Sequence, residues 1–321
     1  NMVLDKSQSS KLPVAPKAPL AYGLAFILSM VLPVFVIIVS EVLDTKIKDK
    51  DDLSRVTDIP LVGMIPLSQK KGELVVSTNT NSPVSESFRS IRTNLQFMQG
   101  NVNSAEENTT LKKVILITSS VGSEGKSFCS MNLAGVIALG GKKTILLGLD
   151  LRKPKLAQYF GQANDKGMSS CLAGINTVDE VITKTPIENL DVIVAGPIPP
   201  NPSELILGET LPKILEELAQ KYDSIILDTP PLALVTDSLI LAEYAGTSIY
   251  IVRQNFTMKS NLDYLNNLYH AGKIKNVSLV LNAIKLGARG YGYGYGYGYG
   301  YYSSENEEKG ITGKIRSKFK R

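Results

Sequence analysis

The chain has 321 residues, 43% of them hydrophobic, so it can bury the core of one large domain or of two modest ones. Two cysteines, Cys129 and Cys171, and the single histidine, His270, argue against a disulfide framework or a Cys/His metal site, and we expect both cysteines to be buried. The net charge of +5 arises at residues 309–321, which hold six basic residues and no acidic one and leave −1 for the rest, so no nucleic-acid-binding face is expected.

The first predicted element is a transmembrane helix at residues 18–43. No charged residue occurs in the 23 positions of residues 18–40. A helix of this length crosses a hydrocarbon core of about 30 Å. One alternative is a buried core helix, which is usually shorter than this apolar run. The other is a signal peptide, but the run is too long for one and no small-residue cleavage site follows it. Residues 1–17, which begin with Asn1 and suggest part of a longer protein, are expected to be an extracytoplasmic, proline-containing segment.

The sequence after the helix predicts a linker and then an α/β domain. Residues 44–82 are charged at first and then rich in Ser, Thr, Asn and Pro, which is typical of a cytoplasmic linker with some local structure. Continuous apolar runs separated by helical patterns follow, and they predict a parallel sheet with helices on both faces over residues 83–288. The predicted strands are residues 114–118, 144–149, 191–195, 224–227, 248–252 and 277–281.

A phosphate-binding loop follows the first of these strands. Gly125, Lys126 and Ser127 match the end of the pattern G-x-x-x-x-G-K-[ST], with Ser120 in place of its first glycine. In this strand–loop–helix setting, backbone N–H groups face the phosphates, Lys126 contacts the β/γ oxygens and Ser127 contacts Mg²⁺. The residues expected to bind ATP are Ser120, Val121, Gly122, Ser123, Glu124, Gly125, Lys126, Ser127 and Phe128.

Aspartates end two other predicted strands. Asp228 ends an apolar run, as a Walker B carboxylate that holds the metal does, and Asp150 ends the run TILLGLD. We expect Ser127, Asp228 and Asp150 to hold Mg²⁺. The loop and Asp228 alone indicate a P-loop ATPase.

Several segments resemble the bacterial tyrosine kinases (BY-kinases), relatives of the deviant-Walker ATPases of cell division and plasmid partition. TILLGLDLRKPK resembles their additional Walker motif, and ILDTPPLALVTDSLIL resembles their Walker B segment, with Asp237 downstream. ESFRSIRTNLQF and AGPIPPNPSELI resemble their E-x-x-R-x-x-R helix and Pro-rich loop. LPVAPKAPL and DIPLVGMIP resemble segments that flank the second membrane span of polysaccharide co-polymerases. The resemblance covers nearly the whole chain and implies a P-loop NTPase-like tyrosine kinase domain.

The resemblance also implies roles for individual residues. The expected catalytic residues are Lys126, Asp150, Asp228 and Arg152, the last as a group that stabilises phosphate charge. Catalysis would then be mainly positioning and charge neutralisation. The family's additional Walker motif usually carries two aspartates, and Gly148 stands at the first position here. Which group accepts the tyrosyl proton is therefore left open.

An amphipathic helix is predicted from residue 83, with Ser82 as its cap. Its apolar face carries Phe88, Ile91 and Leu95. The resemblance implies that Glu86, Arg89 and Arg92 dock on the neighbouring subunit of a homo-oligomeric ring. The alternative for Glu86 and Arg89 is an ordinary surface salt bridge.

The C-terminal region, residues 289–321, begins with a Gly/Tyr repeat. Alternate glycines raise the entropic cost of ordering, so the repeat predicts a flexible tail. It resembles the tyrosine cluster that BY-kinases phosphorylate, and the alternative is a low-complexity spacer. The expected phosphoacceptors are Tyr291, Tyr293, Tyr295, Tyr297, Tyr299, Tyr301 and Tyr302. The basic end that follows carries Ile311, Ile315 and Phe319 at helical spacing, which indicates a segment that could dock on membrane lipid.

The expected function is therefore ATP-dependent tyrosine autophosphorylation, with ATP and Mg²⁺ as cofactors. The resemblance implies control of capsular or exopolysaccharide synthesis and export, with a tyrosine phosphatase and the polymerisation and export machinery as partners. The site is expected to face the cytoplasm from the bacterial inner membrane, because ATP is cytosolic. The alternative function is a membrane-bound regulatory ATPase or nucleotide-gated scaffold, which Gly148 favours and the tyrosines disfavour. An iron–sulfur carrier ATPase would need a C-x-x-C pair, which the sequence lacks.

Overall fold

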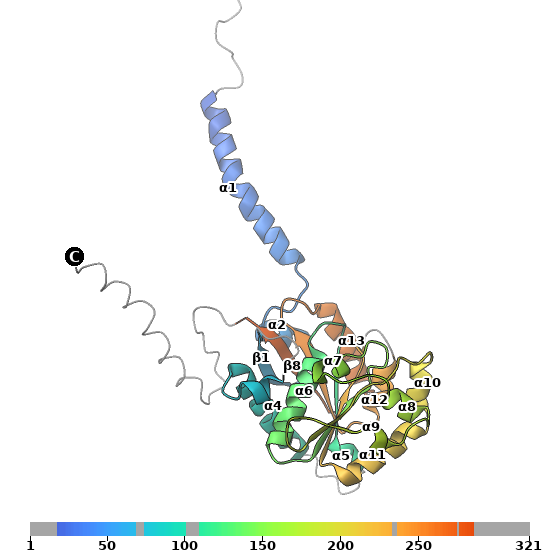
Figure 1. Ribbon diagram of the computed structural model, residues 1–321. Helices are drawn as coiled ribbons and strands as arrows, with labels where there is room; N and C mark the ends of the chain where they lie inside the picture. The colour runs from blue at the N-terminus through green and yellow to red at the C-terminus, as the bar shows by residue number, and fades with distance from the viewer. Residues whose placement is uncertain (1–17, 69–73, 101–108, 233–235, 275, 286–321) are drawn as a thin grey trace, which may run out of the picture. The chain divides into compact units, whose positions relative to one another are not determined.

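The computed structural model describes residues 18–68, 74–100, 109–232, 236–274 and 276–285 (Figure 1). The predicted segment 1–17, the tyrosine cluster and the basic C-terminal end lie outside these residues.

The domain is built on one eight-stranded sheet with the order β1-β8-β7-β2-β6-β3-β5-β4. Its pairs are parallel except for β4 with β5 at one edge. The six predicted strands are all present, so the expected α/β, P-loop NTPase-like class is confirmed. The strands are β1 (Leu61–Pro66), β2 (Val114–Ser119), β3 (Thr144–Gly148), β4 (Thr183–Lys184), β5 (Leu190–Ile193), β6 (Ser224–Asp228), β7 (Thr247–Arg253) and β8 (Val277–Ile284).

Helices cover both faces of the sheet, as the apolar runs predict (Figure 1). On β2, Leu116 packs into one core cluster with α11 and α13, while Ile117 packs into the other with α4 and α6. A strand buried on both faces has no polar side, which explains its continuous apolar sequence. The domain helices are α2 (Lys50–Val56), α3 (Val75–Thr78), α4 (Pro83–Gly100), α5 (Thr109–Lys113), α6 (Lys126–Leu139), α7 (Leu156–Phe160), α8 (Met168–Leu172), α9 (Val178–Val181), α10 (Pro202–Leu207), α11 (Thr210–Lys221), α12 (Asp237–Ala242) and α13 (Lys259–His270).

The amphipathic helix starts where the sequence predicts. Ser82 lies just before α4, and its hydroxyl accepts the backbone N–H of Ser85, in the first turn of the helix, at 3.2 Å. Phe88, Ile91 and Leu95 are all buried in the core beneath α4.

The region expected as a linker contributes to the sheet, which corrects the predicted start of the domain at residue 83. Strand β1 lies within residues 44–82 and pairs in parallel with β8 at one edge of the sheet. Strand β1 is hard to predict from the sequence, because its apolar run is short and is interrupted by Gly63. At Gly63 a Cβ atom would lie 2.2 Å from Cγ1 of Ile91, so the missing side chain is what allows α4 to pack closely on β1.

Before the domain, α1 (Ala18–Leu43) forms one helix that includes Pro33. Its segment Pro19–Ser40 is long and apolar enough to cross a membrane, and none of it is buried against other described residues.

Candidate nucleotide site

The site lies where three neighbouring strands end. Asp228, the last residue of β6, is in register with Ile117 of β2 on one side and with Gly148 of β3 on the other. The N–H of Leu149 donates to the carbonyl of Asp228 at 2.8 Å, which fixes the start of the segment that leads to Asp150. In parallel sheets, ligands bind at this carboxyl edge, where the strands give way to loops.

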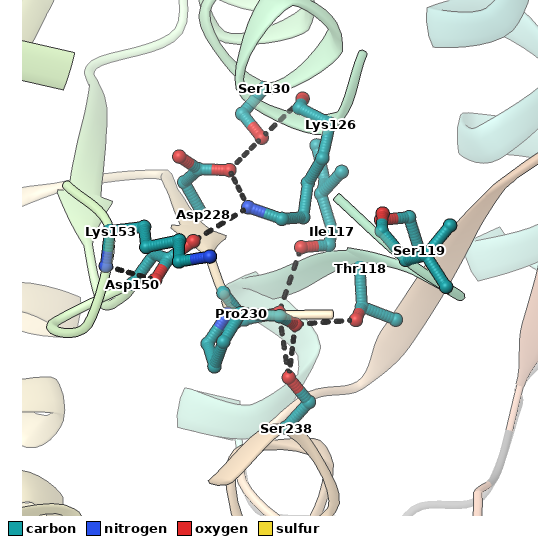
Figure 2. Close-up of polar contacts among 12 residues, drawn as sticks. Ile117, Thr118, Ser119, Lys126, Ser130, Asp150, Lys153, Asp228, Pro230 and Ser238 are labelled. Carbon is teal, nitrogen blue, oxygen red and sulfur yellow. Dashed lines mark hydrogen bonds and ion pairs between the residues drawn. The ribbon is translucent and has the colours of Figure 1, made fainter. Parts of the chain in front are cut away.

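Lys126 joins the two predicted aspartates into one cluster (Figure 2). Its Nζ lies 3.3 Å from Oδ1 of Asp228 and 3.5 Å from Oδ2 of Asp150. The other oxygen of Asp150 accepts the backbone N–H of Lys153 at 3.0 Å, and Asp228 also accepts the Ser130 hydroxyl at 3.0 Å. Lys126, Asp150 and Asp228 were all predicted, and the structure brings all three together.

The cluster is withdrawn from solvent. Lys126 is 8% exposed and Asp228 1% exposed. Buried charges are costly unless they are paired and hydrogen-bonded, and here one ammonium offsets two carboxylates. The cluster therefore holds more acidic than basic side chains, which favours a further cation beside the carboxylates.

The residues present fit Mg²⁺. Ser127, Asp150 and Asp228 offer a hydroxyl and two carboxylates, and oxygen ligands are those that Mg²⁺ prefers. Ser127 is buried in the first turn of α6. Within the described ranges, no group of three or more His, Cys, Asp or Glu side chains gathers as a metal site. The protein would thus supply few ligands, as is usual where substrate phosphates complete the coordination of Mg²⁺.

The loop after β6 is attached to the end of β2. The hydroxyl of Thr118 donates to the carbonyl of Pro230 at 3.0 Å, and the hydroxyl of Ser238 donates to the same carbonyl (Figure 2). Leu232 N–H donates to the carbonyl of Ser119 at 2.7 Å. These bonds hold the loop that follows Asp228 beside the loop that carries Lys126.

The predicted phosphate-binding loop runs between β2 and α6, and its backbone is bent tightly. Ser123 and Gly125 both have positive φ, of 70° and 95°. Phe128, which is also expected to bind ATP, packs its ring edge-on against Phe88 of α4, with ring centroids 5.9 Å apart, and its role at ATP remains a proposal.

Arg152 is not drawn into the Lys126 cluster. Its Nε lies 2.9 Å from Oδ2 of Asp237, and its Nη2 donates to the hydroxyl of Ser203 at 2.8 Å. The Asp237 carboxylate is 1% exposed. Its hydrogen bond with the Arg152 guanidinium raises the pKa of Arg152. The described contacts of Arg152 therefore link the segment after β3 to the first turns of α10 and α12, and its expected role on phosphate remains a proposal.

Of the three residues expected at a subunit contact, Glu86 and Arg89 pair with each other, whereas Arg92 contacts α6. Glu86 and Arg89 form the ion pair predicted as the alternative, and Arg89 also donates to the carbonyl of Thr80 at 2.7 Å. Arg92 is turned inward and donates to the carbonyl of Val136 in α6 at 2.9 Å.

Some residues around the site were not predicted. Ser130 could have been found, because it lies one helical turn after Lys126 and hence on the same face. Thr257 and Asn282, which contact the loop at Glu124, carry no sequence signal that connects them with it. Both cysteines are buried as expected, and burial raises the pKa of the Cys171 thiol to about 11.

The chain is similar to known proteins over most of its length. Residues 112–279 match a family model described as an AAA domain. The tyrosine-protein kinase YwqD of Bacillus subtilis is 33% identical over 219 residues, which cover 68% of this chain and 89% of that protein. The chain belongs to the bacterial tyrosine-protein kinase family.

Longer relatives and solved structures lie in the same family. The tyrosine-protein kinase ptk of Acinetobacter johnsonii is 30% identical over 87% of this chain. The chain spans only 39% of that protein and 37% of EpsB of Ralstonia nicotianae. The crystal structure of the chimerical protein CapA2B2 shares 34% identity, with a TM-score of 0.66 over 74% of this chain and 100% of that one. The kinase domain of the Escherichia coli tyrosine kinase ETK shares 28% identity, with a TM-score of 0.63 over 75% of this chain and 95% of that one.

Proposed function

We propose that this protein is an ATP-dependent tyrosine kinase that phosphorylates the tyrosines of its own C-terminal cluster, residues 291–302. The observation that carries the proposal is the Lys126–Asp150–Asp228 cluster at the carboxyl edge of the sheet, in a member of the tyrosine-protein kinase family. Seven tyrosines follow this domain, six of them each preceded by a glycine, and they supply acceptors in the same chain.

In the proposed reaction, the γ-phosphoryl group passes from ATP to a tyrosine oxygen in line with the leaving oxygen. Lys126 would turn to the β/γ-phosphate oxygens. Asp150 would then be free of that ion pair. It would either accept the tyrosyl proton, or join Ser127 and Asp228 in holding Mg²⁺, which neutralises charge on the phosphate oxygens when it is bound.

The test is the intact mass of the purified full-length chain after incubation with ATP and Mg²⁺, repeated after treatment with a phosphatase. We expect mass increments of one phosphoryl group each, which the phosphatase removes. Lys126→Ala should abolish them. Lys213→Ala, which removes an exposed lysine from α11, is the matched control and should leave them unchanged. Increments that persist in Lys126→Ala would contradict the assigned site.

A second candidate is a membrane-bound regulatory ATPase that does not phosphorylate tyrosine. Gly148 favours it, because the first carboxylate of the additional Walker motif is missing. The same incubation separates the two, since this ATPase would release inorganic phosphate while the protein mass stayed constant.

The wider setting is proposed from the relatives. We place the protein at the bacterial inner membrane through α1, with the nucleotide site in the cytoplasm, and in a homo-oligomeric ring in which one subunit phosphorylates the next. Control of capsule or exopolysaccharide export, a partner phosphatase and contact of the basic C-terminal end with membrane lipid belong to the same proposal.

A further inference from the structure

The phosphate-binding loop contains a buried carboxylate that the mechanism above does not use. Glu124 is 0% exposed. Its Oε1 accepts the hydroxyls of Ser120 and Thr257, and its Oε2 accepts the backbone N–H of Val121 at 2.9 Å. Among the described residues, no Lys, Arg or His lies within ion-pair distance of it. A buried carboxylate held only by neutral donors is unusual, because burial without a counter-charge is costly.

Thr257 is itself fixed in place. It is 0% exposed, its carbonyl accepts the N–H of Ile47 at 2.9 Å, and its hydroxyl accepts the N–H of Arg253 at 2.8 Å. The hydroxyl accepts Arg253 through one lone pair and donates its hydrogen to Glu124, because a carboxylate can only accept. The direction of the Thr257–Glu124 hydrogen bond is thereby set.

The backbone of the loop is held from the same side. Asn282, at the carboxyl end of β8, donates from Nδ2 to the carbonyl of Glu124 at 2.8 Å. Arg253, at the end of β7, donates from Nη1 to the carbonyl of Ser123 at 2.6 Å. A Cβ atom at Gly125 would lie 2.1 Å from Nδ2 of Asn282, so glycine is needed there for contact as well as for its φ of 95°.

We propose that Glu124 and Thr257 are positioning residues for the nucleotide phosphates. They connect the loop to the β7–α13 segment and set the backbone conformation of residues 121–125, directly before Lys126. Binding of phosphate by backbone N–H groups depends on those groups being oriented in advance, because orienting them on binding costs free energy. The inference rests on the proposed function only in that the loop binds ATP.

The test compares three variants of the full-length chain: Thr257→Val, which removes the hydroxyl, Thr257→Ser, which restores it, and Thr144→Val. Thr144 is the matched control, because its hydroxyl is also buried and donates to the carbonyl of Lys142, at the opposite, amino end of β3. Equilibrium binding of MgATP and of inorganic pyrophosphate is measured for each variant, together with thermal unfolding and the KM and kcat for ATP.

We expect Thr257→Val to weaken binding of both ligands about tenfold and to raise the KM for ATP more than it lowers kcat, as loss of one hydrogen bond to a carboxylate would do. Thr257→Ser and Thr144→Val should bind as the parent protein does. Parent-like binding by Thr257→Val would overturn the proposal. Equal weakening by Thr144→Val would also overturn it, because the effect would then follow general stability. A parent protein that binds MgATP but forms no phosphotyrosine would contradict the proposed function while leaving this inference standing.

Discussion

Arg92 and Val136 connect two helices that are far apart in sequence: Nη1 of Arg92 in α4 donates to the carbonyl of Val136 in the last turn of α6 at 2.9 Å. The carbonyl of Val136 also accepts the N–H of Gly140, which caps α6, at 3.2 Å, so Arg92 adds a second donor at this helix end. A cation near the C-terminal end of a helix also interacts favourably with the helix dipole. Arg92 therefore stabilises the helix that begins with Lys126.

Arg92→Ala should lower the free energy of unfolding by about 1–2 kcal/mol, because the hydrogen bond and the interaction with the helix end are both lost. Arg89→Ala removes a more exposed ion pair with Glu86 and should cost less than about 1 kcal/mol. Chemical unfolding of the two variants measures the difference.

Arg89→Ala also tests the proposed ring. If Glu86 and Arg89 contact a neighbouring subunit, light scattering of Arg89→Ala should show a smaller assembly with nearly parent-like stability. If the mass of the assembly is unchanged in Arg89→Ala, Glu86 and Arg89 form only a surface salt bridge.

A second prediction concerns Gly148, where the family usually has an aspartate. A Cβ atom at this position would lie 2.9 Å from the backbone nitrogen of Ala195 and 3.2 Å from the carbonyl carbon of Val194. Backbone atoms of the segment that directly follows β5 cannot move aside cheaply. Gly148→Ala should therefore lower the free energy of unfolding by about 1–3 kcal/mol, as overpacking does.

Gly148→Asp should lose more stability than Gly148→Ala, because its carboxylate would also stand in register with Asp228 on the next strand. Gly122→Ala is the control for stability, since no atom lies within 4 Å of a Cβ placed there. A Gly148→Asp protein with parent-like stability and faster autophosphorylation would show that the strand can accommodate the missing carboxylate.

The third prediction is a pH dependence at Glu124. Burial raises the pKa of this carboxyl above its ordinary value of 4.5, and only part of that shift is offset by its hydrogen bonds with Ser120, Thr257 and Val121. The folded state therefore holds the proton more tightly than the unfolded state. The stabilisation is fully present below pH 4.5 and is lost as the pH rises through the raised, folded-state pKa.

Unfolding of the parent protein and of Glu124→Gln across pH 4–8 measures this dependence. Relative to the variant, the parent should become less stable as the pH rises, and other titrating groups cancel in the difference. The nearby Tyr250 does not interfere, because burial raises its pKa further above this range. A difference that is constant with pH would contradict a raised pKa.

The sequence predicts those site residues that lie beside a recognisable strand or loop, and it does not predict contacts between residues that are far apart in the chain. Lys126, Asp150 and Asp228 each follow an apolar run that can only be a buried strand, so their meeting at one edge follows from a parallel sheet. The contact of Thr257 with Glu124 spans 133 positions and that of Arg92 with Val136 spans 44, and no periodicity relates such pairs. Strand β1 is short and interrupted by a glycine, and only its pairing with β8 makes it a strand.

The last prediction concerns Arg152, for which the resemblance implies a role on phosphate and the structure shows a contact with Asp237 and Ser203. Asp237 is almost fully buried, so removing Arg152 would leave a carboxylate without its counter-charge. The Arg152 side chain is 40% exposed, which reduces the loss from that of a fully buried pair. Arg152→Ala should therefore lower the free energy of unfolding by about 2 kcal/mol.

The double variant Arg152→Ala with Asp237→Asn distinguishes the two roles. Asparagine removes the unpaired charge while keeping an oxygen that can accept the Ser203 hydroxyl, which Asp237 accepts at 2.6 Å. If Arg152 acts only through Asp237, the double variant should regain most of the lost stability and with it most of the autophosphorylation rate. If Arg152 also contacts phosphate, stability should return while the rate stays low. Unfolding and single-turnover phosphorylation of the same preparations separate these outcomes, and a double variant no more stable than Arg152→Ala would contradict the buried ion pair as the cause.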